Sequence, residues 1–335
     1  MGKRIGKYTV SLENNPRILS SFSIVGPKEG EGPLSKYFDR VLVDDLNGED
    51  SFEKAESSLQ KLSIEGILNR SKLKNDDIDY LISGDLLNQL TSSHFAARDF
   101  KIPYLGVYGA CSTMTESLGI GAMLYDGGFG KNIICTTSSH FSSAERQYRF
   151  PLEFGSQKKE ISQWTVTGAG SFLIGRGENL PRITYITTGS IEDYGIKDAE
   201  NMGAAMAPAA ALTLKRHFEE TKRDPDYYDI IITGDLGHFG IEICREFIKD
   251  LGYTLGDNFK DCGVLIFDKE TQGTNSGGSG CGCSATVFTS YVYKNMLSGD
   301  INRALLISTG ALLSPTSTLQ GESIPCIAHA VAIEN

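Results

Sequence analysis

No stretch of this sequence approaches the run of about 20 apolar residues that a transmembrane helix requires. The first ten residues, MGKRIGKYTV, lack the apolar core of a signal peptide. Position 6 is a glycine, where the N-myristoylation pattern has serine or threonine. We therefore expect any contact with a membrane to be peripheral or to be made through a partner protein.

The sequence also lacks the short motifs of nucleotide and metal sites. The segment GGSGCGC (277–283) precedes an expected helix and could bind an anion through backbone N–H groups, but no Gly-Lys-Ser/Thr follows it, so a nucleotide P-loop is not indicated. Cys281 and Cys283 form a C-x-C pair without a second pair at zinc-site spacing. The acidic segments lack EF-hand spacing. We predict no metal site and no cofactor.

The sequence has fewer basic than acidic residues. The 335 residues include 32 Lys and Arg against 42 Asp and Glu, which gives a net charge of −10. Such a chain is a poor nucleic-acid binder, and an anionic ligand would need a local basic pocket. The seven cysteines are scattered and odd in number, which favours a reducing compartment over a disulfide framework. Contents of 40% hydrophobic and 22% charged residues are ordinary for a globular protein.

Two segments far apart in the chain have the same pattern. DIDYLISGDLLNQL begins at Asp77 and DYYDIIITGDLGHFG begins at Asp226. Each has an acidic turn, an apolar strand and then Gly-Asp-Leu, so that Gly84 corresponds to Gly234. A single pair of this kind is a weak signal on its own.

A second pair of segments follows in the same order. Residues 110–139 and 282–311 align without a gap when Cys111 is set on Cys283, a shift of 172 positions. Each reads as a turn, Cys-Ser, a helix, a glycine turn and an apolar strand. Two pairs in one order indicate an internal duplication. We expect the two segments to superpose as a helix followed by a strand.

The alternation of strands and helices in each half predicts an α/β fold with mostly parallel sheets covered on both faces. Segments 132–140 and 303–311 are continuous apolar strands of the buried type. No linker or low-complexity tract separates the halves, which we place at 1–180 and 181–335 and expect to pack as one body.

The segment YGACSTMTES (108–117) places Cys111 between an apolar strand and a helix. A thiol at a helix N-terminus has a lowered pKa because the helix dipole favours the thiolate. Backbone N–H groups at the same place can hold an oxyanion or a carboxylate. The segment therefore predicts either a nucleophile or an anion pocket in which the cysteine serves as a small side chain.

A duplicated α/β half with this cysteine resembles the thiolase and ketoacyl synthase superfamily. The strings SSHFSSAERQYRFPLEFGSQ, QWTVTGAG, NMGAAMAPAA, ITGDLGHFG, STGALLSP and IPCIAHAVAI are more specific, and resemble the stage V sporulation protein AD family from about residue 16 to the C-terminus. The resemblance implies a thiolase-like fold, with two pseudosymmetric α/β halves in a layered αβαβα arrangement.

The same resemblance implies a function in spore-forming bacteria. Members bind dipicolinic acid (pyridine-2,6-dicarboxylate), free or as its calcium chelate. They act with membrane-embedded proteins of the same transport system, which move the compound into the developing spore and out at germination. The implied location is peripheral, on the cytoplasmic side of the forespore or spore inner membrane. The superfamily also implies a homodimer formed beside the strand IPYLGVYGA (102–110), with Tyr104 and Tyr108 in the contact.

The catalytic helper motifs of condensing enzymes are missing. Thr233, Gly234 and Asp235 stand where the superfamily has a catalytic histidine, and NSGGSGCGCSAT (275–286) replaces the usual Gly-Asn motif. The resemblance therefore implies a binding scaffold, and we expect no condensing activity.

Two other functions stay open at this point. One is a cysteine-dependent acyltransferase, in which Cys111 would be the nucleophile and His140 or His329 the base. The other is a structural subunit with a relict pocket.

The candidate ligand contacts come from several segments. Arg146 and Arg149 could each bind a carboxylate through two parallel N–H···O bonds, although a solvated loop or a dimer contact is the ordinary role of such residues. A flat pyridine ring also suits an aromatic face such as Tyr148, Phe141 or Trp164. The predicted ligand-binding residues are Cys111, His140, Arg146, Arg149, Gly234, Asp235, His238, Gly280 and His329.

Overall fold

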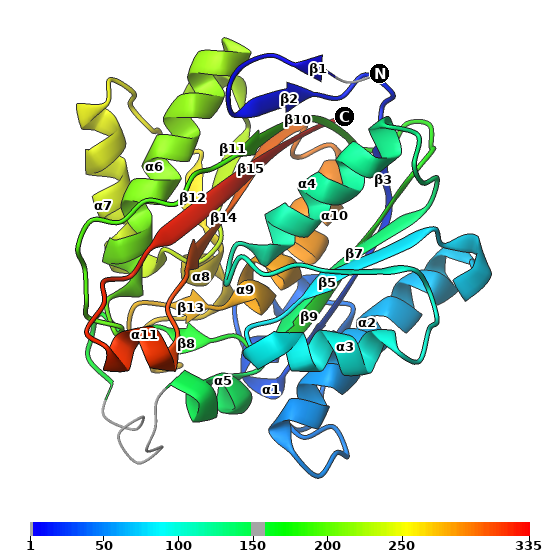
Figure 1. Cartoon of the computed structure of the whole chain (residues 1–335), viewed down its shortest axis with the longest axis horizontal. Helices are drawn as coiled ribbons and strands as arrows, with labels where there is room; N and C mark the ends of the chain where they lie inside the picture. The colour runs from blue at the N-terminus through cyan, green and yellow to red at the C-terminus, as the bar shows by residue number, and fades with distance from the viewer. Residues whose placement is uncertain (1–2, 149–157) are drawn as a thin grey trace.

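The computed structural model describes residues 3–148 and 158–335 (Figure 1). The main path of hydrogen-bonded strands has two parts, of order β3-β9-β7-β5-β6 and β10-β15-β14-β11-β12, and β3 and β10 meet only at Arg17 and Arg182. The first part comprises β3 (Arg17–Val25), β9 (Gly168–Gly175), β7 (Ile133–Ser139), β5 (Tyr80–Gly84) and β6 (Tyr104–Gly106). The second comprises β10 (Arg182–Thr188), β15 (Cys326–Glu334), β14 (Arg303–Ala311), β11 (Ile230–Thr233) and β12 (Phe259–Asp261).

The two parts repeat one pattern of strand directions. In the first, β9 is antiparallel to both β3 and β7, whereas β5 is parallel to β7 and β6. In the second, β15 is antiparallel to both β10 and β14, whereas β11 is parallel to β14 and β12. The repeat confirms the pseudosymmetric halves. The expectation of mostly parallel sheets was wrong, because β9 and β15 each return antiparallel into the middle of a sheet.

Helices separate and cover the two sheets. Those of the first half are α1 (Pro27–Gly30), α2 (Phe52–Ser71), α3 (Thr91–Ala97), α4 (Thr113–Asp126) and α5 (Phe141–Tyr148). Those of the second are α6 (Met202–Thr221), α7 (Gly237–Asp250), α8 (Cys262–Ile266), α9 (Cys281–Val287), the π-helical η6 (Phe288–Val292), α10 (Tyr293–Ser298) and α11 (Pro315–Leu319). The short elements are β1 (Lys3–Arg4), β2 (Thr9–Ser11), β4 (Arg40–Val41), β8 (Trp164–Thr165), β13 (Gly278–Ser279), η1 (Ser35–Tyr37), η2 (Asn75–Asp77), η3 (Asn88–Leu90) and η5 (Pro225–Tyr227).

The hydrophobic core shows how these layers stack. The largest cluster joins residues of α4 and of α9–η6–α10 with residues from both sheets, so these helices form the central layer. A second cluster packs α6 and α7 against the second sheet, and a third packs α2 and α3 against the first. In Figure 1, α6 and α7 lie on one side of the molecule and α2 and α3 on the other. The layers are therefore helix, sheet, helix, sheet, helix, as expected for a thiolase-like fold.

The duplicated segments fold as the alignment predicts. Segment 110–139 forms α4 and then β7, and segment 282–311 forms the α9–η6–α10 helix and then β14. The division at residue 180 stays a prediction. It falls just before β10 begins at Arg182, but β2 from the N-terminal segment pairs with β10 and so extends the second sheet.

Glu29 on α1 is an unusual core residue because its carboxyl group is almost completely buried. Its Oε1 accepts a hydrogen bond from the Thr167 N–H at 2.9 Å. Its Oε2 is buried and has no hydrogen-bond partner among the described residues. Burial raises the pKa of Glu29 to about 8, so the carboxyl group is mostly protonated at neutral pH in the folded protein.

The wild-type protein should become less stable to unfolding as the pH rises, because Glu29 ionises. We expect the substitution Glu29→Gln to remove this loss of stability. The folded pKa of Glu29 lies above its unfolded value of 4.5, so the contribution of the neutral group is complete below pH 4.5 and is lost as the pH rises towards 8. The slope in that window is at most about 1.4 kcal/mol per pH unit. Urea unfolding at pH 5, 6.5 and 8 should show the variant gaining stability on the wild type as the pH rises. The exposed Glu31→Gln serves as the control, and equal pH profiles for wild type and Glu29→Gln would contradict the assignment.

Candidate functional site

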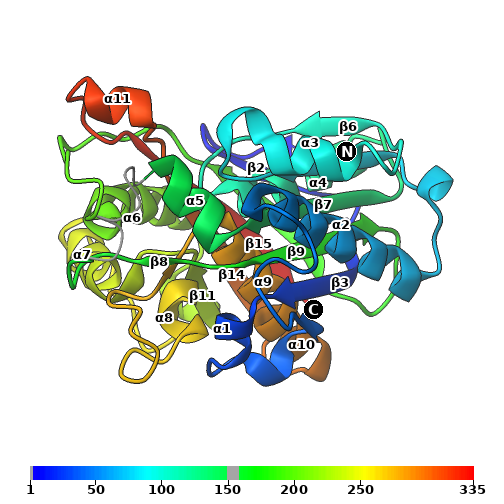
Figure 2. The ribbon, with the colours of Figure 1, turned by 90° about the horizontal axis from the view of Figure 1, so that it is seen from below.

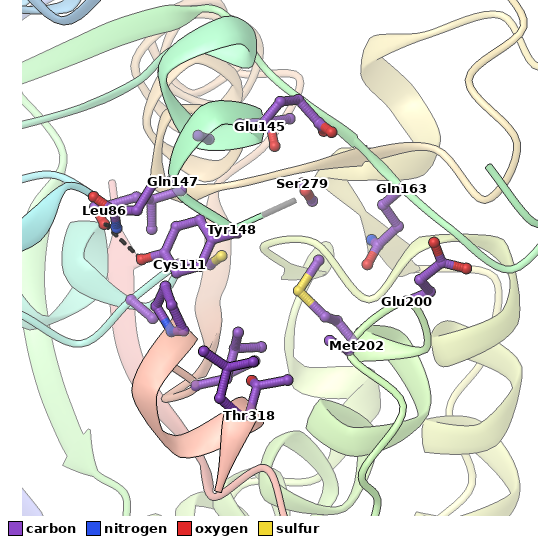
Figure 3. Close-up of a pocket in the computed structure, with 18 residues that line it drawn as sticks. Leu86, Cys111, Glu145, Gln147, Tyr148, Gln163, Glu200, Met202, Ser279 and Thr318 are labelled. Carbon is purple, nitrogen blue, oxygen red and sulfur yellow. Dashed lines mark hydrogen bonds between the residues drawn. The ribbon is translucent and has the colours of Figure 1, made fainter. Parts of the chain in front are cut away.

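A cavity of about 450 Å³ opens in front of Cys111 between the two halves (Figure 3). Figure 2 shows α5, which forms one wall, lying across the junction, with α6 and α7 on one side of it and α2 and α3 on the other. The described lining residues are Leu86, Ala110, Cys111, Ala144, Glu145, Gln147, Tyr148, Gln163, Thr165, Ala199, Glu200, Met202, Ser279, Ala311, Leu313, Pro315, Thr318 and Leu319. Most of these side chains are apolar, as in ordinary small-molecule sites.

The backbone of the turn before α4 holds Cys111 at the cavity. Ala110 adopts a left-handed conformation with φ 50°. The hydroxyl of Ser112 donates to the Gly109 carbonyl at 2.7 Å, and that of Thr113 donates to the Ala110 carbonyl at 2.6 Å. Gly310 on β14 packs against this turn so closely that a Cβ there would lie 2.0 Å from the Gly109 oxygen. A side chain at position 310 would therefore push the Cys111 turn out of place.

The thiol of Cys111 is held in its neutral form. Burial raises its pKa well above the ordinary value, and the nearby Asp235 and Cys281 add to the effect. The expectation that the helix N-terminus lowers this pKa was wrong, because desolvation outweighs the helix dipole. The N–H groups of Ser112 and Thr113 donate to Gly109 and Ala110 within the turn. They are therefore not directed at a ligand.

Asp235 lies behind Cys111 and joins the two halves. Its Oδ2 accepts from the Gly280 N–H at 2.9 Å, its Oδ1 accepts from the Thr309 hydroxyl at 2.9 Å, and it is hydrogen-bonded to the Cys111 thiol. Burial raises the pKa of Asp235 to about 7. The Gly280 N–H was predicted to bind a ligand carboxylate. The structure corrects this, because Asp235 already occupies that N–H.

Hydrogen bonds from side chains of α5 to the backbone of residues 86–88 hold the rim and wall of the cavity in place. The Tyr148 hydroxyl and the Gln147 amide both donate to the Leu86 carbonyl, at 2.6 Å and 2.9 Å. Gln147 also accepts from the Asn88 N–H at 2.9 Å. Tyr148 thus presents its ring to the cavity from a fixed position, as Figure 3 shows.

The charges around the cavity are mainly acidic. Among the described lining residues, Glu145 and Glu200 carry negative charge, and none is Lys, Arg or His. Lys158 pairs with Glu145 at 3.0 Å, and Lys159 lies 3.5 Å from Glu200. The two lysines thus compensate the carboxylates from outside the lining and leave no excess of positive charge.

The predicted arginine contacts lie elsewhere or cannot be placed. Arg146 is more than half exposed and pairs with Glu53 at 3.1 Å in a neighbouring groove. This corrects its expected place in the cavity, because its position on α5 turns it towards α2. Arg149 lies outside the described residues.

The predicted histidines also lie outside the described lining of the cavity. His140 contacts the Asp45 carbonyl at 2.8 Å and accepts from the Ser142 N–H at 3.1 Å. His329 accepts from the Gly189 N–H at 3.2 Å, and burial lowers its pKa to about 4. His238 is half-buried near the start of α7, where its N–H donates to the Ser276 carbonyl. These contacts are structural, and only Cys111 among the nine predicted residues faces the cavity in the described chain.

Gly234 and two suggested aromatic residues also have other roles. The Gly234 carbonyl accepts from the Cys283 thiol at 3.4 Å. Phe141 and Trp164 stack on each other with ring centroids 3.9 Å apart, and Lys158 lies over both rings. Their faces are therefore covered, which leaves Tyr148 as the aromatic side chain from the sequence analysis that lines the cavity.

Sequence reasoning missed several lining residues, of which Gln163 is the most informative. It is only 2% exposed, and its Nε2 donates to the carbonyls of Asp235 at 2.7 Å and Gly278 at 3.1 Å. Its Oε1 has no partner among the described residues. The string QWTVTGAG contains this glutamine, but no sequence pattern marks a buried amide.

No group of three or more His, Cys, Asp or Glu side chains in the described part of the chain is arranged to hold a metal ion. No helix of that part combines the length and apolarity needed to cross a bilayer.

The fold and the cysteine-based cavity define a member of the thiolase-like class. The structure is similar to 3-oxoacyl-[acyl-carrier-protein] synthase III from Aquifex aeolicus, with a TM-score of 0.60, 12% identity and coverage of 96% of this chain and 100% of that one. It is equally similar to Xanthomonas campestris OleA, with a TM-score of 0.60, 13% identity and coverage of 97% and 99%.

The family is narrower than the class. The family model for stage V sporulation protein AD (SpoVAD) matches residues 6–334. The stage V sporulation protein AD of Bacillus subtilis is 43% identical over 332 residues, covering 99% of this chain and 98% of that protein. This chain belongs to the stage V sporulation protein AD family, as its sequence motifs indicated.

We expect Cys111 to resist alkylation. Only the thiolate reacts with iodoacetamide, and burial together with Asp235 disfavours the thiolate. At pH 7.5, mass spectrometry should show modification at least ~10-fold slower than that of a free small thiol, because each unit of raised pKa lowers the thiolate fraction tenfold. Urea-unfolded protein is the control and should react at all seven cysteines. Faster labelling of Cys111 than of the small thiol would identify an activated nucleophile.

Proposed function

We propose that this protein binds dipicolinate without covalent chemistry in the Cys111 cavity and passes it to membrane-embedded partners during sporulation and germination. Its family membership supports a sporulation role, and the resemblance described above implies the ligand. The observation that carries the proposal is a Cys111 thiol that faces a roomy cavity yet is held neutral. A neutral, unreactive thiol is compatible with a cavity that only binds its ligand, whereas a condensing enzyme needs a thiolate and a base.

The dimensions and composition of the cavity support a small flat guest. A volume of about 450 Å³ lies within the usual range for ligand pockets, about 300–1,000 Å³. Leu86, Met202 and Leu313 offer apolar surface, and Tyr148 offers an aromatic ring that suits a pyridine. Dipicolinate also has no activated acyl group that a thiol could attack.

The alternative function is acyl transfer at Cys111. The position of Cys111 and the similarity to a 3-oxoacyl synthase fold favour it. The described cavity lining has no histidine to act as base, and Asp235 disfavours the thiolate. Incubation with radiolabelled acyl-CoA separates the two functions, because a thioester on Cys111 would establish the enzyme.

Equilibrium binding of dipicolinate tests the proposal directly. Trp164 is the only tryptophan, and its neighbours Gln163 and Thr165 line the cavity, so its fluorescence should report occupancy alongside calorimetry. Cys111→Ser should bind within about threefold of wild type, because a small neutral donor is retained. Ala199→Phe should weaken binding at least ~tenfold, or about 1.4 kcal/mol, by filling the rim.

Arg146→Ala is the matched control for these variants. It removes a charged side chain from the groove beside the cavity and should leave binding unchanged. Absence of dipicolinate binding to the wild-type protein, with or without calcium, would refute the proposed function.

We also propose that the protein is a homodimer formed through β6. This strand pairs with β5 on one side and is an edge strand of the described sheet. Leu105 and Tyr108, at 39% and 43% exposure, are large side chains for such an edge. Edge strands with unpaired backbone groups readily pair with a second chain. Because the Cys111 turn follows β6 directly, the cavity would lie close to the interface.

Light scattering at micromolar concentration tests the dimer. The wild type should have twice the chain mass, and Leu105→Lys should shift the protein towards the monomer, because it places like charges face to face across the two-fold axis. Leu319→Lys, which changes an exposed leucine on α11, is the control and should remain dimeric. A monomeric wild type would rule out this interface.

A further inference from the structure

A second pocket of about 450 Å³ lies at the other end of β7 from the Cys111 cavity. Asn132, which lines this second pocket, directly precedes β7, whereas α5 follows β7 and walls the Cys111 cavity. A strand of seven residues spans about 20 Å, so the two sites are separate. The described lining residues of the second pocket are Leu19, Ser20, Ser21, Arg70, Ser71, Leu73, Asn132, Leu173, Leu180, Tyr293, Lys294 and Leu297.

The charges around the second pocket are basic. Its described lining contains Arg70 and Lys294 and no Asp or Glu, whereas that of the Cys111 cavity contains two Glu and no basic side chain. Asp39 pairs with both cations through one oxygen, at 2.9 Å from Arg70 and 2.8 Å from Lys294. Because one carboxylate faces two cations, one positive charge of this cluster remains. In a chain of net charge −10, an anionic ligand needs a local basic site of this kind.

Both cations keep N–H groups that can bind a ligand. Among the described residues, the guanidinium of Arg70 donates to Asp39 and to the Ser21 carbonyl, which uses two of its five N–H groups. The ammonium of Lys294 donates to Asp39 and to the Tyr37 carbonyl, which uses two of its three. These bonds hold both side chains at the pocket, so little further conformational entropy is lost when a ligand binds them.

Two hydroxyl groups of the lining have unused hydrogen-bonding capacity. Ser20 on β3 is 7% exposed and Ser71 is the last residue of α2. The Oγ atom of each is buried and has no hydrogen-bond partner among the described residues. A buried hydroxyl without a partner is costly, so a ligand that accepts hydrogen bonds from Ser20 and Ser71 recovers that cost. Carboxylate and phosphate oxygens accept such bonds and also complement the two cations.

The rest of the lining is mainly aliphatic. It includes five leucines, together with Tyr293, whose hydroxyl donates to the Ile18 carbonyl at 3.0 Å. Leu297 on α10 is 52% exposed. An alkyl chain in the pocket would remove apolar surface of Leu297 from water, which favours binding. A purely inorganic anion has no group that would make these contacts.

We propose that the second pocket binds an amphiphilic anion, in which a carboxylate or phosphate group is joined to an alkyl chain. The head group binds Arg70, Lys294 and the two serine hydroxyls, and the chain lies against the leucines. Fatty acids and anionic membrane lipids share this chemistry. The site is independent of the function proposed for the Cys111 cavity, because the two have no described lining residue in common.

Calorimetry on the full chain with three soluble probes tests the proposal. Decanoate, kept below its micelle concentration, should bind at least ~tenfold more tightly than inorganic phosphate, which lacks the chain. It should exceed decyltrimethylammonium, which carries the opposite charge, by at least ~tenfold as well. Failure of decanoate to bind, or equal binding of decanoate and either other probe, would overturn the proposal.

Two substitutions locate the bound decanoate. Leu297→Glu places a carboxylate in the second pocket and should weaken binding at least ~tenfold, because like charges meet. Ala199→Phe, which fills the rim of the Cys111 cavity, should retain the binding. The matched control Ile243→Glu adds the same charge at an exposed aliphatic side chain of α7 and should also retain it. Loss of binding in Ala199→Phe and retention in Leu297→Glu would overturn the proposal, because decanoate would then occupy the Cys111 cavity.

Lys294→Gln provides a second test of the pocket if thermal unfolding shows that Leu297→Glu is destabilised. It removes one of the two cations and should weaken decanoate binding at least ~threefold while leaving that of decyltrimethylammonium no weaker. Unchanged decanoate binding in a folded Lys294→Gln protein would overturn the assignment of the head group to this pocket.

Cosedimentation with vesicles distinguishes the two sources of the anion. A bilayer lipid is indicated when vesicles of phosphatidylglycerol bind the wild type better than vesicles of phosphatidylcholine, and when Leu297→Glu but not Ile243→Glu abolishes the difference. A free amphiphile is indicated when decanoate binds as expected and the two vesicles do not differ. Both results support the second pocket as an amphiphile site.

Discussion

The structure of the site depends on one buried carboxylate, that of Asp235. It accepts hydrogen bonds from the Gly280 N–H and the Thr309 hydroxyl of its own half and is bonded to the Cys111 thiol of the other. A buried carboxylate is costly unless such donors surround it. The hydrogen bonds that offset the cost of burying Asp235 therefore also hold the Cys111 turn against the second half. They keep the Cys111 thiol protonated as well.

This arrangement differs from the one that a condensing enzyme requires around its cysteine. A nucleophilic cysteine needs a nearby base that accepts its proton and electropositive surroundings that favour the thiolate. Here burial and the Asp235 charge act in the opposite direction. The cavity persists because it is built by the backbone, through the left-handed Ala110 and the close approach of Gly310, and these features do not depend on the charge of the thiol.

The electrostatics of the cavity also differ from those of a simple anion pocket. The N–H groups that sequence reasoning assigned to ligand carboxylates are already bonded, that of Gly280 to Asp235 and that of Gly282 to Ser139. The lysines nearby are paired with Glu145 and Glu200. The described lining therefore offers neither free N–H groups of this turn nor an excess of positive charge.

The duplication, the helix-then-strand order around Cys111 and Cys283 and the place of Cys111 at a turn could be predicted from local pattern and spacing. The family could be predicted from the resemblance of longer strings in the sequence. Tertiary structure alone decided which side chains meet. His140, His329 and Arg146 are close to the right strands or helix, yet their side chains bond to Asp45, Gly189 and Glu53. Gln163 carries no pattern at all, because its place in the cavity wall depends on the carbonyls of Asp235 and Gly278, which come from distant segments and fix its orientation. Local sequence encodes periodicity and turns, but the direction of a side chain depends on partners that only packing brings together.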